Sequence, residues 1–79
     1  MVRRKQVFMD QLLITLRKVA LEEPVNLARY IAVFTSELQA SKFEFDMEEM
    51  LWFSAKTEEI IEQYLGGRLI TENNYYGHA

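Results

Sequence analysis

The sequence contains no cysteine, one proline, three glycines and a single histidine. Without cysteine the chain has neither a disulfide framework nor a thiolate metal site. No apolar run approaches the roughly 20 residues that a membrane-spanning helix needs. The basic start at residues 1–5 resembles that of a signal peptide, but charged residues interrupt the segment that follows it. We therefore expect a cytoplasmic protein that neither carries a secretory leader nor binds a membrane.

Residues that could support catalysis or hold a cofactor are also scarce. The only histidine, His78, lies one residue from the end of the sequence, where a fixed hydrogen-bond geometry is hard to maintain. Glu58 and Glu62 share a helix face, but the sequence lacks the Glu-x-x-His pairs of four-helix metal sites. The expectation is a non-enzymatic protein with no catalytic residue, no cofactor and no metal.

Apolar side chains are plentiful by contrast. Of the 79 residues, 49% are hydrophobic and 13% aromatic, which is rich for this size and argues against disorder. A chain of this length makes one domain, near the lower limit for folding without disulfides or metals. The spacing of its apolar residues is that of amphipathic helices.

The best-defined helix is expected over residues 46–65. Asp46 and Glu49 are spaced as a capping box, and Gly66 is suited to the left-handed conformation that ends a helix. Gly66-Gly67 also matches the double-glycine site that ends the leaders of some exported peptides, an alternative that the sequence leaves open. The core stripe of this helix is expected to contain Met50, Phe53, Thr57, Ile60, Ile61 and Tyr64, flanked by Met47 and Leu65.

Two further helices are expected over residues 6–22 and 24–40. Residues 3–5 are basic, and positive charge is unfavourable at the positive, N-terminal end of a helix dipole, so residues 1–5 are expected to fray. Pro24 suits the first turn of the second helix. The predicted fold is a single all-α domain spanning residues 1–79, a small three-helix bundle with a short irregular or extended C-terminal tail at residues 68–79. Phe43 and Phe45, in the link between the second and third helices, are expected to plug the core.

Some apolar residues are left over once this core is filled. Val7, Ile14 and Leu21 are spaced by seven and form a narrow stripe on the polar side of the first helix. Leu51 and Trp52 lie outside the core stripe of the third helix, with Trp52 placed among polar residues. Both features are candidate partner-binding surfaces, and Trp52 is the strongest single candidate because tryptophan is enriched at binding hot spots. For the stripe on the first helix the alternative is chance, because three apolar residues often occur on a polar helix face. For Trp52 the alternative is that the tail or the Lys56 stem covers it within one chain.

The function that these features favour is a protein–protein interaction module, a small regulator or adaptor. It is expected to form a homodimer or to bind a larger protein. Residues 1–20 carry five basic and one acidic side chain, a balance of +4, whereas residues 46–67 carry one basic and six acidic, a balance of −5. This asymmetry indicates either that the first and third helices pack together or that the acidic face meets a basic partner.

A small DNA-binding regulator is the alternative function. Arg3, Arg4 and Lys5 could serve as a basic arm, and three short helices form the frame of helix-turn-helix proteins. A third helix that begins with Asp46 and Glu48 would, however, be repelled by phosphates, and the sequence pI of about 5.1 is far from the basic range of such domains.

Overall fold

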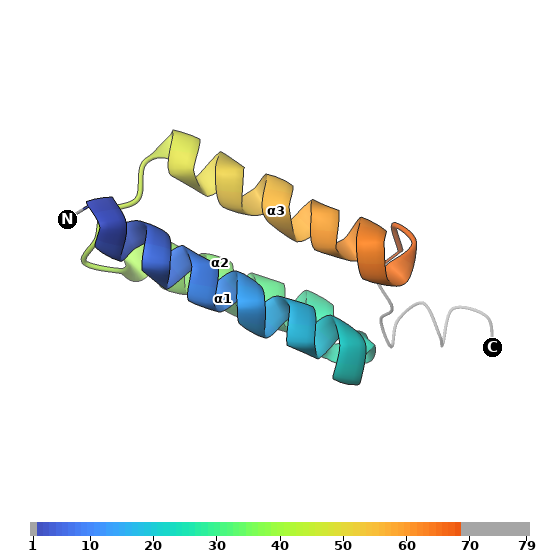
Figure 1. Cartoon of the computed structure of the whole chain (residues 1–79). Coiled ribbons are helices and arrows are strands. Elements are labelled where there is room, and N and C mark those ends of the chain that lie inside the picture. Colours follow the sequence, from blue (N-terminus) through green and yellow to red (C-terminus); the bar gives the residue numbers. More distant parts are fainter. Residues whose placement is uncertain (1, 69–79) are drawn as a thin grey trace.

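The computed structural model describes the backbone of residues 2–68 and the side chains of residues 4–68. Its elements are α1 (Val2–Glu22), a short 3-10 turn η1 (Pro24–Asn26), α2 (Leu27–Ala40) and α3 (Met47–Leu65). Figure 1 shows α2 running back beside α1, and α3 running in the same direction as α1. The predicted all-α three-helix bundle is confirmed for these residues; the tail at 69–79 lies outside them.

The ends of α3 form as the local sequence predicts. The Glu49 backbone N–H donates to Asp46 Oδ1 at 2.8 Å, and the Asp46 N–H donates to Glu49 Oε1 at 2.9 Å, which completes the capping box. At the other end, Gly66 and Gly67 have φ angles of 64° and 88°. A Cβ atom makes this left-handed backbone conformation unfavourable, so the end of the helix by itself accounts for glycine at both positions.

The first two helices begin differently from the prediction. The expectation that residues 1–5 fray is wrong for the described residues 2–5, because α1 begins at Val2. The reason is a contact distant in sequence: Lys5 Nζ lies 3.1 Å from Glu49 Oε1 and 5.5 Å from the centre of the Phe45 ring. This anchor offsets the unfavourable placement of basic residues at a helix start. In the second helix, the first turn at Pro24–Asn26 is 3-10 rather than α.

The core lies between all three helices. Its fully buried members include Leu16 of α1, Leu27 and Leu38 of α2, and Phe53 and Ile60 of α3. Helix α3 rests mainly on α1, and α2 has its main contacts with α1 rather than with α3. All side-chain polar atoms that are buried in the described residues have hydrogen-bond partners. No buried polar side chain in this part of the chain therefore needs a further partner.

One end of the bundle is closed by an aromatic plug, formed by Phe8, Phe43 and Phe45. The ring centre of Phe8 lies 5.5 Å from that of Phe43 and 6.1 Å from that of Phe45, and the ring centres of the two link residues are 5.8 Å apart. These are favourable distances for aromatic pairs. Glu44, between the two link residues, takes a positive φ of 56°, which turns the chain between them. Phe45 thus packs against the core, as the sequence predicts, whereas Phe43 is half-buried and contacts the rings of Phe8 and Phe45.

Candidate interaction surfaces

The most regular exposed apolar feature is a line of three side chains along α1, which we call the α1 ridge: Val7, Ile14 and Leu21. Their exposed fractions are 51%, 54% and 68%. Seven residues make almost two helical turns, so the three side chains lie above one another on the side opposite the buried Leu16. The structure therefore leaves this predicted stripe uncovered by any described part of the chain.

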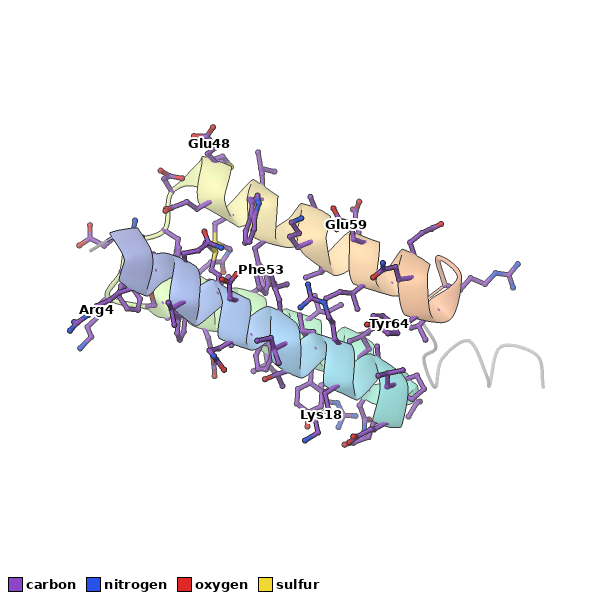
Figure 2. The ribbon with its side chains drawn as sticks, viewed as in Figure 1. Arg4, Lys18, Glu48, Phe53, Glu59 and Tyr64 are labelled. Carbon is purple, nitrogen blue, oxygen red and sulfur yellow. The ribbon has the colours of Figure 1, made fainter. Side chains whose placement is uncertain are left out.

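Charged and polar side chains flank the α1 ridge. Asp10 and Arg17 lie on one flank, and Gln11 and Lys18 lie on the other, all exposed. In Figure 2, Lys18 points away from α1 on the side remote from α3. The ridge is thus an apolar line in a surface that carries both signs of charge, which is the composition of many interface rims.

The two residues of the second predicted feature, Leu51 and Trp52, differ in how far they are exposed. Leu51 is 62% exposed, and Met47, one turn earlier, is 75% exposed although it was expected to flank the core. Trp52 is half-buried instead: its ring packs against the core, and Lys56 Nζ lies 5.7 Å from the ring centre. Trp52 does lie beside Glu48 and Lys56, as the helical period predicts, but this flank of α3 faces α1, so the ring is only partly exposed. Its role in partner binding stays a prediction.

A shallow hollow of about 300 Å³ lies beside Trp52. It is lined from α1 by Lys5, Gln6 and Met9, and from α3 by Glu48, Glu49 and Trp52. The Lys5–Glu49 ion pair spans it, and Glu48 adds a second carboxylate to its lining. The tail, which is the other predicted cover for Trp52, lies outside the described residues from position 69 onward.

The outer face of α2 is a further apolar surface, which is not among the predicted binding surfaces. Val25 and Val33 are nearly half exposed, and Ala32, Ser36 and Ala40 are exposed beside them. The small side chains leave a hollow of about 460 Å³, lined by Ala32, Val33, Ser36, Glu37 and Ala40. A signal for this face was present: Arg29 and Glu37 are the only charged residues of α2, so its outer side is unusually poor in charge for a surface helix.

The residues of the alternative nucleic-acid arm are not arranged as an arm. Arg3, Arg4 and Lys5 all belong to α1, and Lys5 is bound to Glu49. Figure 2 shows Arg4 pointing away from the bundle and Glu48 pointing away at the start of α3. The side chain of Arg3 lies outside those described. Arg4 is therefore the one member of this set seen to be exposed.

The described residues offer little other chemistry. Within them, no three histidine, aspartate or glutamate side chains converge as metal ligands would. No helix in the same part of the chain is long and apolar enough to cross a membrane. His78 lies outside it. The charged side chains at the surface follow the sequence asymmetry, with Glu48 and Glu59 pointing outward from α3 (Figure 2).

Comparisons with known proteins find no match to a family model, to a curated protein or to a solved structure. The fold is a small three-helix bundle with several exposed apolar residues. These exposed residues are the features of the described chain that suggest a binding surface.

Proposed function

We propose that this protein is a non-enzymatic protein–protein interaction module, a small regulator or adaptor that docks through apolar helix faces and self-associates. The observation that carries the proposal is the α1 ridge, in which three aliphatic side chains at seven-residue spacing are each more than half exposed. Seven-residue spacing of apolar side chains is the pattern by which one helix packs along another.

The energetics of burial support this role. Removing apolar surface from water gains roughly 25 cal/mol per Å², or about 1.5–3 kcal/mol for a fully buried aliphatic side chain. The described part of the chain realises only part of this gain for the ridge, because more than half of each of its residues is exposed: Val7, Ile14 and Leu21. A partner that covers the ridge would recover that free energy, so the ridge is suited to association.

The outer face of α2 supports the same proposal in a different way. Its alanine and serine side chains allow the backbone of another helix to approach closely, and Val25 and Val33 offer apolar contact. This face suits a larger protein partner that fills the hollow. The non-enzymatic part of the proposal is supported by the lack of cysteine and by the single histidine of the sequence, since these residues perform much nucleophilic and acid–base chemistry.

Sedimentation velocity over a wide range of concentrations tests the proposal. We expect concentration-dependent association of the unmodified chain. Ile14→Glu should weaken it at least tenfold, because a carboxylate would have to be buried without a partner. Thr15→Glu is the matched control: Thr15 is exposed on the same helix but lies about 100° from the ridge, and its substitution should change association little. Val33→Glu places a carboxylate on the outer face of α2, so the same measurement tests whether that face takes part in association.

The contradicting result is equally clear. If the unmodified chain and all variants sediment as monomers up to about 1 mM, far above the dissociation constants of functional protein complexes, self-association is wrong.

A further inference from the structure

We propose that the α1 ridge binds a second copy of this chain, with the two α1 helices antiparallel and Ile14 at the centre of the contact. The inference rests on the proposed function and specifies its partner and geometry. It is drawn from the position of the charged residues on either flank of the ridge, which distinguishes one orientation of a second copy from the other.

The ridge is symmetric about Ile14. Val7 and Leu21 lie seven residues before and after it, or about 10 Å along the helix axis in each direction. When a second α1 is laid antiparallel across the ridge, Ile14 meets Ile14 of the second copy. Val7 then meets Leu21 of the second copy, and Leu21 meets Val7. All three apolar layers are filled in one register.

The residues that flank the ridge would meet different residues of the second copy in an antiparallel and in a parallel pair of α1 helices. At about 100° per residue, Asp10 and Arg17 lie about 40–60° to one side of Ile14, and Gln11 and Lys18 lie as far to the other side. In an antiparallel pair the two-fold axis is perpendicular to the helices, so each flank faces the same flank of the second copy. In a parallel pair the axis runs along the helices, so opposite flanks meet.

Charge complementarity favours the antiparallel pair. Asp10 lies about 6 Å before Ile14 along the axis and Arg17 about 4.5 Å after it, so each Asp10 faces Arg17 of the second copy. On the other flank, each Gln11 faces Lys18 of the second copy. A parallel pair would instead place Arg17 beside Lys18 of the second copy, twice. Opposite charges across an interface fix its orientation, and like charges disfavour the alternative.

The charges concerned are free to make these contacts. The two ion pairs of the described residues are Lys5–Glu49 and Lys56–Glu59, so Asp10, Arg17 and Lys18 belong to neither. Asp10 accepts a hydrogen bond from the Gln6 side chain at 2.9 Å, which leaves its other carboxylate oxygen able to accept from Arg17 of a second copy.

The small area of the contact limits the affinity of the dimer. One helix pair with three apolar side chains from each copy buries less than the roughly 1,200 Å² of a stable interface. The dimer is therefore weak, and its population depends on concentration. The flanking charges at its rim are exposed to water and set orientation more than affinity.

Disulfide trapping tests the orientation directly, because the chain has no cysteine of its own. Val7→Cys and Leu21→Cys variants, which replace exposed residues, are mixed and mildly oxidised at a concentration where association is measurable. The antiparallel register predicts the mixed disulfide in at least tenfold excess over either symmetric product, whereas random collision gives about a twofold excess. Thr15→Cys, on the same helix but off the ridge, measures the collisional background.

Charge reversal gives an independent readout in solution. Arg17→Asp and Asp10→Arg should each weaken association severalfold, because each places like charges opposite one another at both Asp10–Arg17 pairs of the contact. An equimolar mixture of the two variants should restore it, since in the heterodimer two carboxylates of one copy face two guanidinium groups of the other. In a parallel pair, Arg17→Asp would strengthen association instead, because the new carboxylate would lie beside Lys18 of the second copy.

The possible outcomes separate the two proposals. Symmetric disulfides at Val7→Cys, or tighter association of Arg17→Asp, overturn the antiparallel register and leave the interaction function intact. Association that persists in Ile14→Glu and gives no trapped product above the Thr15→Cys background assigns self-association to another face, which also overturns the inference alone. A chain that is monomeric at all concentrations overturns the inference together with the self-association part of the proposed function, and leaves only docking to a different protein.

Discussion

Apolar side chains are covered at the closed end of the bundle but exposed on the outer side of α1, although two residues adjacent in sequence belong one to each region. Phe8 belongs to the aromatic plug, where its ring lies 5.5 Å from that of Phe43. Val7, its neighbour in sequence, is 51% exposed on the α1 ridge. The presence of more apolar residues than the core between the helices needs therefore does not by itself indicate a binding surface. What matters is whether a segment of the same chain crosses over it.

The difference between the two regions has a structural cause. The link between α2 and α3 has to cross the end of the bundle, and it carries Phe43 and Phe45 to positions where their rings meet Phe8. Lys5 and Glu49 fasten the same end by an ion pair at 3.1 Å. In the described part of the chain, no segment passes over the α1 ridge, so its side chains stay in contact with water.

The largest effect is expected from emptying the aromatic plug. Phe8→Ala should lower the free energy of unfolding by about 2–3 kcal/mol, somewhat less than for a fully buried phenylalanine because Phe8 is half-buried. Val7→Ala is the matched control at the next residue, and it should change this free energy by less than about 0.5 kcal/mol in dilute solution. Urea unfolding of both variants measures the difference. Equal losses would show that the ridge supports the fold as much as the plug does.

A smaller effect is expected from the ion pair at the same end. Glu49→Ala removes both the capping box and the partner of Lys5, and should cost about 1.5 kcal/mol. Glu49→Gln keeps the geometry of the box but loses the charge, so it should cost about half as much. A double-mutant cycle with Lys5→Met should give a coupling of about 0.5–1 kcal/mol that shrinks at high salt. A coupling near zero would mean that another contact makes α1 begin at Val2.

Features that depend on residues close in sequence could be predicted. The capping box of α3 involves Asp46 and Glu49, three residues apart, and the helix stop involves Gly66 and Gly67. The α1 ridge could be predicted for the same reason, since it follows from the spacing of Val7, Ile14 and Leu21 within one helix. Local geometry and helical period determine such features.

Features that depend on how the helices pack could not be predicted. The start of α1 is stabilised by a contact between residues 44 apart in sequence, and the expectation of a frayed end did not consider it. The position of Trp52 depends on which flank of α3 faces α1, which the helical pattern alone does not determine. The small side chains of α2 leave room for a neighbouring helix, but the sequence does not determine which side of α2 the rest of the chain covers, so this face is not among the predicted binding surfaces.

The concentration dependence of thermal stability tests the central claim most directly, since that claim assigns the α1 ridge to association rather than to the fold. We expect the Tm of the unmodified chain to rise by about 3–8 °C over a hundredfold increase in concentration, because a dimer is stabilised by mass action. Ile14→Glu should match it within about 2 °C at the lowest concentration and show no rise. A Tm that is independent of concentration in the unmodified chain, or an Ile14→Glu variant already unstable when dilute, would contradict the account.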